Sequence, residues 1–324
     1  MIYDLLKWVA GIALHWFYRD IRVVGRERIP IQGPLLIAVN HQNALVDSLI
    51  AGWVIPRRIT MTAKATLTRN PLIAVLFKVL RVVPLRRVSD ETARSLGGSL
   101  DPARNADAFR ELFEVLKRNG AVLIFPEGKS HNETGLEPLR TGLARVALQA
   151  RNDGKIDGIR IVPLGLVFED KGTPGTVVGA RVGKVIDLDT WMGEDPSALT
   201  AEIANRLRVV SESAGLPSEM KQAPQKLRPI RDHLIATAAW WGRLTHRLPI
   251  RLARSFAIHK STNADEPAMF TILFGLGLVL LTYAVHLTII EVLLHSVLVG
   301  CLYLATLIGG AYWAAFESRP RGRH

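Results

Sequence analysis

Two long uncharged stretches near the C-terminal end constrain the fold of this chain most. Residues 269–290 contain no Asp, Glu, Lys or Arg, and residues 292–316 form a second such stretch; each includes a single histidine. A helix needs about 20 apolar residues to cross the hydrocarbon core of a bilayer. We therefore expect a transmembrane hairpin that is joined by residues 291–296. A pair of buried core helices is the alternative interpretation.

The charge of the chain indicates an anionic partner. Among 324 residues, of which 48% are hydrophobic, the formal net charge is +12. The basic residues form small groups without interleaved aromatic residues, so we expect an anionic membrane surface and no nucleic acid. The single cysteine, Cys301, can form no intrachain disulfide.

Basic residues on both sides of the expected hairpin predict its orientation. By the positive-inside rule, loops rich in Lys and Arg stay in the cytoplasm. We therefore expect a membrane protein whose main domain faces the cytoplasm. The flanking basic residues are Arg247, Arg251, Arg254 and Lys260 before the hairpin, and Arg319, Arg321 and Arg323 after it.

Residues 1–19 show apolar residues at helical spacing. The stretch is too short to span a bilayer and lacks a basic leader followed by a small-residue cleavage site, so a signal peptide is not expected. A helix lying in the membrane interface, with Trp8 and Trp16 at headgroup depth, is the preferred interpretation. A helix that packs on the domain is the alternative.

Between residues 20 and 215, short β-like runs alternate with helical runs. This pattern predicts an α/β fold, a sheet flanked by helices. The expected strands are 21–24, 35–39, 59–63, 82–85, 121–125, 161–168 and 176–186, and the expected helices are 47–54, 71–79, 103–118, 138–151 and 197–213.

The remaining segments connect this domain to the hairpin. Residues 89–105 are expected to form an exposed loop or lid, and residues 215–226, which are polar and carry two prolines, a linker. Residues 230–256 predict a basic amphipathic helix that is broken at Pro249 and lies on the membrane. The expected organisation is an interfacial helix (1–19), a catalytic domain (20–215), a linker with the amphipathic helix (216–267), and a two-helix anchor with a basic tail (268–324).

A histidine and an aspartate follow the second expected strand. His41 leaves the end of the strand, and Asp47 lies near the start of the next helix. A carboxylate that fixes one ring nitrogen of an imidazole leaves the other as a general base, which can take a proton from a hydroxyl group. The pair alone is weak evidence, but three downstream segments fit the same chemistry.

The first of these segments ends in two arginines and the second contains a glutamate. Arg86 and Arg87 follow a strand, where guanidinium groups can bind a phosphate bidentately. In Phe125–His131, Pro126 stiffens the exit from a buried strand, so that Glu127 projects from a rigid loop. The glycine spacing required for a nucleotide-binding P-loop is missing.

The third segment places a cation in the first turn of an expected helix. Pro138 would open that helix, so a phosphate could meet both its free N–H groups and Arg140. A fourth segment, residues 161–165, is a buried strand whose proline, Pro163, suits a sheet edge or a bulge.

Together the four segments resemble the glycerophosphate acyltransferase superfamily, which includes the lysophosphatidic acid acyltransferases. The resemblance covers about residues 20–215 and is most specific at Phe125-Pro126-Glu127-Gly128. Five residues separate His41 from Asp47, where most of the family has four. This spacing, the Phe-Pro-Glu-Gly-x-Ser-His sequence and the hydrophobic hairpin resemble the branch of fungal glycerol-3-phosphate/dihydroxyacetone-phosphate acyltransferases.

The resemblance implies roles for residues in the family's first, second and fourth motifs. In the first motif, His41 would be the general base and Asp47 its partner. Arg87 matches the arginine of the second motif, with Arg86 as support, and Pro163 matches the fourth motif.

The third motif matches less completely. Glu127 and Gly128 match it, and Glu127 is expected to orient the cations or a glycerol hydroxyl. Ser130 stands where the family has an arginine. Lys129 or Arg140 is therefore expected to supply the charge that binds phosphate, and Pro126 would support the loop.

The resemblance implies a membrane-bound O-acyltransferase of phospholipid biosynthesis. It would transfer a fatty acyl group from acyl-CoA or acyl carrier protein to a hydroxyl of a glycerol phosphate, with glycerol 3-phosphate favoured over lysophosphatidic acid. No metal and no cofactor are expected. A membrane-anchored thioesterase or hydrolase and a non-catalytic lipid-binding protein are the alternatives.

Overall fold

The computed structural model describes residues 2–65, 82–85, 106–131, 135–212, 229–262 and 266–316. The elements in chain order are α1 (Ile2–Phe17), β1 (Asp20–Val24), the 3-10 turn η1 (Arg26–Arg28), β2 (Leu35–Val39), α2 (Ala44–Val54), β3 (Ile59–Lys64), β4 (Val83–Leu85), α4 (Ala106–Lys117), β5 (Ala121–Ile124), α5 (Gly142–Asn152), β6 (Arg160–Phe168), β7 (Val177–Val182), β8 (Ile186–Asp187), α6 (Pro196–Ser211), α7 (Pro229–Lys260), α8 (Glu266–Leu294) and α9 (Val297–Phe316).

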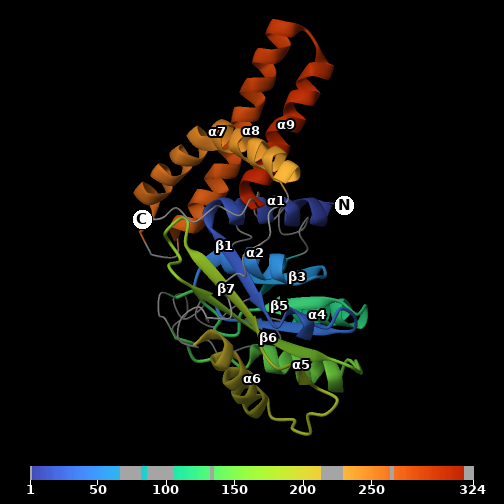
Figure 1. Cartoon of the computed structure of the whole chain (residues 1–324). Helices are drawn as coiled ribbons and strands as arrows, with labels where there is room; N and C mark the ends of the chain where they lie inside the picture. Colours follow the sequence, from blue (N-terminus) through green and yellow to red (C-terminus); the bar gives the residue numbers. More distant parts are fainter. Residues whose placement is uncertain are drawn as a thin grey trace, which may run out of the picture.

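The described strands form one mixed sheet, as the alternating pattern predicts (Figure 1). Its order is β1-β7-β6-β2-β5-β3-β4, with β8 paired to β6 beyond the end of β7. The run from β6 through β2, β5 and β3 to β4 is parallel, whereas β7 is antiparallel to β6. The carboxyl ends of β2, β5 and β6 therefore meet at one edge, where parallel sheets place their sites.

Helices cover both faces of the sheet because the central strands are apolar on both sides. In β2, Leu35, Ile37 and Val39 face one core with α1 and α2, and Leu36 and Ala38 face a second core with α4, α5 and α6. All five residues are fully buried. Continuous apolar runs are typical of parallel strands covered on both faces.

The strand expected at 176–186 is interrupted. It divides into β7 and β8, and the gap lies opposite Pro163 of β6. Proline has no N–H to donate to a neighbouring strand. The N–H of Gly183, in the gap, donates to the carbonyl of Pro163 at 2.8 Å. Pro163 thus lies within a paired strand, where its neighbour breaks.

The helix expected at 138–151 begins later than predicted, at Gly142. The N–H of Arg140 donates to the carbonyl of Pro126 at 2.8 Å, so the preceding residues run along the β5 loop as an extended segment. Pro138 does not open the helix, and Arg140 does not lie in its first turn. The expectation of a phosphate site at that helix N-terminus is therefore wrong.

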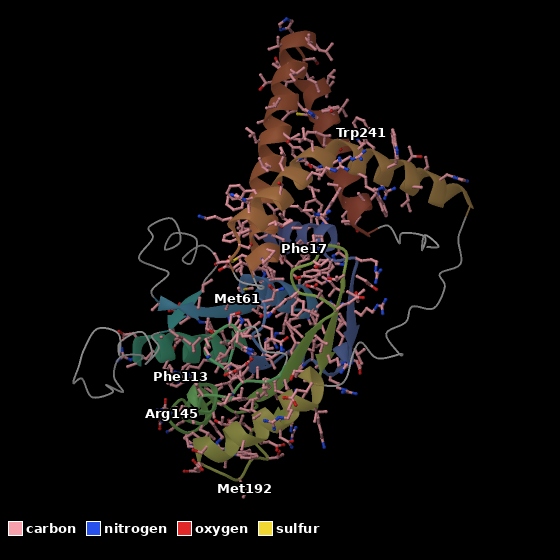
Figure 2. The ribbon with its side chains drawn as sticks, turned by 90° about the vertical axis from the view of Figure 1, so that its left-hand side faces the viewer. Phe17, Met61, Phe113, Arg145, Met192 and Trp241 are labelled. Atoms are coloured by element: carbon pink, nitrogen blue, oxygen red, sulfur yellow. The ribbon has the colours of Figure 1, made fainter. Side chains whose placement is uncertain are left out.

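The two apolar stretches form α8 and α9, which project from the domain as a hairpin (Figures 1 and 2). They meet at His295 and Ser296, and Glu291 belongs to α8, so the turn is shorter than predicted. Both helices are long and apolar enough to cross a membrane, and less than a third of each apolar window is buried. A core helix would be mostly buried.

Helix α7 lies across the base of the hairpin, in contact with both α8 and α9 (Figure 1). It continues through Pro249, so the predicted break is wrong. Gly242 lies against Gly310 of α9, and His246 bonds through Nε2 to the hydroxyl of Tyr283 in α8 at 2.7 Å. Packing of α7 on α8 and α9 holds the helix together across the hydrogen bond that the proline cannot make.

Helix α1 packs between the domain and the hairpin. Gly11 lies against the ring of Trp53 in α2, and the indole N–H of Trp16 donates to the carbonyl of Ala311 in α9 at 3.2 Å. Its outer edge exposes Leu5 and Trp8, among other apolar residues. Helix α1 therefore packs on the domain, as the alternative interpretation expects, and it also exposes an apolar edge of the kind that an interfacial helix presents to a membrane.

Several predicted segments fall outside the described residues. They are the helix at 71–79, the loop or lid at 89–105, the linker at 215–226 and the basic tail after residue 316.

The contact between Gly242 and Gly310 generates a stability prediction. A Cβ on residue 242 would lie 1.9 Å from the carbonyl oxygen of Gly310. We expect Gly242→Ala to destabilise the packing of α7 by about 1–3 kcal/mol, as overpacking does. The control is Gly309→Ala in α9, where a Cβ meets nothing within 4 Å. Thermal unfolding in detergent should show a lower midpoint for Gly242→Ala alone; equal midpoints would contradict the close crossing.

Candidate active site

The histidine and the aspartate singled out by the sequence meet at the end of β2. His41 follows the strand, Asp47 lies in the first turn of α2, and Nδ1 of His41 is 3.0 Å from Oδ2 of Asp47. The Asp47 side chain is fully buried, whereas that of His41 is 12% exposed. In the neutral ring, this contact keeps the proton on Nδ1 and leaves Nε2 as the acceptor. Among the described residues, Nε2 has no hydrogen-bond partner.

Two further contacts fix this pair. The N–H of Asn43 donates to Oδ2 of Asp47 at 2.7 Å, which holds the carboxylate against its own loop. The ring of Phe125 stacks on the His41 imidazole, with centroids 4.0 Å apart and planes inclined by 16°. The stacking and the Asp47 contact together set the ring plane and the direction of Nε2.

Glu127 occupies a different position from the one expected. It is 2% exposed, and it lies beneath the His41 loop. Its Oε1 accepts from the N–H of His41 at 2.6 Å, and its Oε2 accepts from the N–H of Glu137 at 3.0 Å and bonds to Nε2 of His131. Both oxygens are committed to these three donors. The carboxylate therefore holds the loops and does not orient Lys129 or Arg140.

Ser130 and His131 are functional candidates to which sequence reasoning gave no role. The Oγ of Ser130 accepts from the N–H of Ala44 at 3.1 Å, at the start of α2, where Ala44 has a positive φ of 43°. The N–H of His131 donates to the carbonyl of His41 at 3.2 Å. The Ser-His dipeptide after Glu-Gly was the only sequence signal for these contacts.

The rear of the His41 loop is held by a second group of residues that the sequence did not reveal. Nζ of Lys171, in the loop after β6, donates to the carbonyls of Gln42 at 3.0 Å and His131 at 3.2 Å. The side chain of Asn40 exchanges two hydrogen bonds with the main chain of Leu166, at 2.9 and 2.7 Å. Their signal in the sequence is only a polar residue beside a strand end.

Tyr18 connects α1 to this group. Its hydroxyl donates to the carbonyl of Lys171 at 3.1 Å and accepts from Nδ2 of Asn43 at 2.9 Å. Burial raises the pKa of the Tyr18 hydroxyl well above its usual range, and the charge of Asp47 raises it further. The hydroxyl therefore keeps its proton and remains a donor.

The candidate phosphate-binding cations lie on the outer side of the β5 loop. Lys129 is exposed and pairs with Glu137 at 3.9 Å, and Arg140 is exposed. Gly128 has a φ of 80°, and a Cβ there would lie 3.0 Å from Cδ and Nε of Arg140, so the guanidinium side chain lies along this turn. Arg86 and Arg87 fall outside the described residues. The buried Pro126 supports the loop through its carbonyl.

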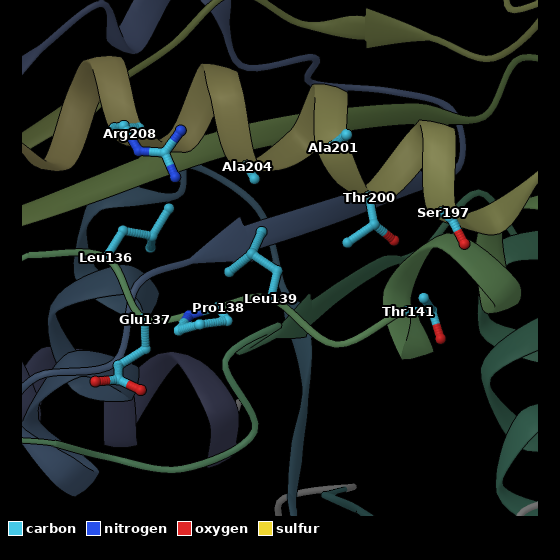
Figure 3. Close-up of a pocket in the computed structure, with 10 residues that line it drawn as sticks. All are labelled: Leu136, Glu137, Pro138, Leu139, Thr141, Ser197, Thr200, Ala201, Ala204 and Arg208. Carbon is cyan, nitrogen blue, oxygen red and sulfur yellow. The ribbon is translucent and has the colours of Figure 1, made fainter.

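A cavity of about 430 Å³ lies behind the same loop, between residues 136–141 and α6 (Figure 3). Leu136 and Leu139 face Thr200, Ala204 and Arg208 across it (Figure 3). Neither His41 nor Asp47 lines this cavity. We therefore do not assign the reaction to it.

Comparison with known proteins gives three findings. Residues 20–167 match the family model described as Acyltransferase. The chain is 24% identical over 245 residues to glycerol-3-phosphate O-acyltransferase 1 of Saccharomyces cerevisiae, across 52% of this chain and 32% of that protein. It is 26% identical over 172 residues to a chloroplastic 1-acyl-sn-glycerol-3-phosphate acyltransferase of Arabidopsis thaliana, across 52% and 42%.

A solved structure is also similar. The 1-acyl-sn-glycerophosphate acyltransferase of Thermotoga maritima is 20% identical, with a TM-score of 0.49, over 69% of this chain and 82% of that one. The chain spans less than half the length of each of the two curated relatives named above.

Proposed function

We propose that this protein is a membrane-bound O-acyltransferase acting on a glycerol phosphate, and the match of residues 20–167 to the acyltransferase family model supports this proposal. The observation that carries the proposal is the His41–Asp47 pair at 3.0 Å, with Nε2 of His41 left as an acceptor. A base in this arrangement suits proton removal from a hydroxyl. The relatives include enzymes named for glycerol 3-phosphate and for its 1-acyl derivative.

The reaction needs one base and no acyl-enzyme. The acceptor hydroxyl gives its proton to Nε2 of His41 while its oxygen attacks the thioester carbonyl of acyl-CoA or acyl carrier protein. Asp47 stabilises the imidazolium that forms. When the tetrahedral intermediate collapses, the C–S bond breaks and the proton passes from His41 to the sulfur. The products are an ester and a free thiol. That the reaction uses no metal and no cofactor remains a prediction.

The phosphate of the acceptor is proposed to lie against the cations beside the β5 loop. Lys129 is 63% exposed, and its ion pair with Glu137 is correspondingly weak, so a phosphate can replace the carboxylate. Arg140, held along Gly128, offers a planar donor pair. Arg87, supported by Arg86, remains part of the proposal although it lies outside the described residues.

The first prediction concerns His41. We expect His41→Ala to lower turnover by about 10²–10⁴-fold, the usual contribution of a general base, while the protein stays in the membrane fraction. The measurement is thiol release from acyl-CoA with glycerol 3-phosphate, lysophosphatidic acid or no acceptor, together with product analysis. Turnover above about a tenth of wild type would contradict the assignment.

The same assay separates the alternatives. Thiol release without an acceptor would indicate a hydrolase, and no release with any acceptor would indicate a lipid-binding protein. A faster reaction with lysophosphatidic acid than with glycerol 3-phosphate would show that lysophosphatidic acid is the preferred acceptor.

The second prediction concerns the phosphate. We expect Arg140→Gln to raise the KM for the phosphate-bearing acceptor about tenfold, the effect of losing one charged hydrogen bond, with the KM for the thioester unchanged. The control is Arg145→Gln, which removes the same charge from the exposed face of α5 (Figure 2). A change confined to the KM of the thioester would contradict the proposed role.

The membrane arrangement is proposed from α7, α8 and α9. We propose that α8 and α9 span the bilayer with the catalytic domain on the cytoplasmic side, and that α7 lies in the interface. On α7, Leu244, Leu248 and Leu252 are exposed at four-residue intervals. Arg247 and Arg251 are exposed on the adjacent side of the helix. This is the pattern of a helix in an anionic interface.

The third prediction tests whether α7 lies in the membrane interface. In a Cys301→Ser background, a spin label at Leu248→Cys should be more accessible to oxygen than to a water-soluble nickel chelate in proteoliposomes, because the site faces acyl chains. The control is Val209→Cys on α6, which is 65% exposed and lies at the opposite end of the molecule (Figure 1). Equal accessibility to the chelate at both sites would contradict an interfacial α7.

A further inference from the structure

A second histidine–carboxylate pair lies beneath the His41 loop. Nε2 of His131 bonds to Oε2 of Glu127, and the two side chains are 6% and 0% exposed. Neither group has a role in the chemistry proposed above. A buried pair of this kind is costly unless each member is satisfied by hydrogen bonds.

Glu127 connects this pair to the main chain of His41. Its other oxygen accepts from the N–H of His41 at 2.6 Å, and the N–H of His131 donates to the carbonyl of His41 at 3.2 Å. Both main-chain groups of His41 are therefore held by the His131–Glu127 unit. The direction of the His41 side chain depends on that main chain.

The proton arrangement of His131 follows from its contacts. Nε2 must carry hydrogen to donate to the carboxylate. Nδ1 is buried and has no hydrogen-bond partner among the described residues. A hydrogen on Nδ1 would be a buried, unpaired donor, so Nε2 is the nitrogen that the structure equips to donate. Two further charged residues lie next to the pair: Lys171, whose Nζ lies 3.2 Å from the carbonyl of His131, and Glu137, whose N–H donates to Glu127.

We propose that His131 is a positioning residue for the acyl transfer, and this inference rests on the proposed function. Its donated hydrogen bond keeps Glu127 in place, and Glu127 keeps the His41 amide in place. Without that bond the carboxylate can rotate away from the His41 N–H, and Nε2 of His41 leaves the direction of the acceptor hydroxyl. Small displacements of a catalytic group can cost about 10²-fold in rate.

The acceptor should still bind in that case. Two of the cations assigned to its phosphate, Lys129 and Arg140, are exposed, and among the described residues neither forms a hydrogen bond or an ion pair with His131. The loss should therefore appear in kcat, with KM for the acceptor nearly unchanged.

The test compares two substitutions in the full-length protein in nanodiscs. Gln places an amide N–H near the position of Nε2, whereas Leu has no donor. We expect His131→Leu to lower kcat about 30- to 100-fold with acceptor KM within about twofold, and His131→Gln to stay within about fivefold of wild type. The control for a lost histidine is His233→Leu, at an exposed position of α7. If His131→Leu does not fold, His131→Asn, whose amide is too short to reach Glu127, replaces it.

A double-substitution cycle tests whether His131 acts through Glu127. Once Glu127→Gln has removed the carboxylate, adding His131→Leu should lower kcat by less than about threefold more. Three results would each overturn the proposal. They are effects of the two substitutions on kcat that multiply independently, a kcat of His131→Gln no higher than that of His131→Leu, and a wild-type kcat in His131→Leu. His41→Ala, assayed alongside, distinguishes failure of this inference from failure of the proposed function. An inactive His41→Ala with an unaffected His131→Leu refutes the positioning role alone, whereas an active His41→Ala refutes the proposed function and this inference with it.

Discussion

The hydrogen bond between the buried carboxylate of Glu127 and the main-chain N–H of His41 is the contact on which the rest of the site depends. It joins the loop after β5 to the loop after β2, and the second oxygen of Glu127 extends the connection to Glu137 and His131. A buried carboxylate is stable only where such donors surround it. Movement of either loop would remove at least one of these donors from the buried charge, so the imidazole projects from a firmly held main chain.

The same loops connect the site to the side of the molecule that carries α8 and α9. Tyr18, at the end of α1, bonds to Asn43 and Lys171 beneath the His41 loop, and α1 also packs on α9. A long acyl chain gains about 0.8 kcal/mol for each CH₂ removed from water. In the proposed reaction, placing the base close to the helices assigned to the bilayer gives the product a short path into lipid.

The sequence was informative where a residue's neighbours lie close in the chain. His41 and Asp47 meet because a strand end and the first turn of the next helix are adjacent, and the apolar runs specify α8 and α9. Two of the three partners of Glu127 are main-chain N–H groups, which leave no trace in the residue pattern. The late start of α5 and the continuity of α7 through Pro249 depend on contacts with distant segments, which local propensity cannot show.

The central claim is that Nε2 of His41 takes the proton of the acceptor hydroxyl. A structure of the protein with glycerol 3-phosphate bound tests it most directly. The account predicts a glycerol hydroxyl within about 3 Å of that nitrogen, in hydrogen-bonding distance, with the phosphate beside Lys129 and Arg140. A bound acceptor whose hydroxyl groups all lie away from His41, or whose phosphate occupies the cavity beside α6, would contradict it.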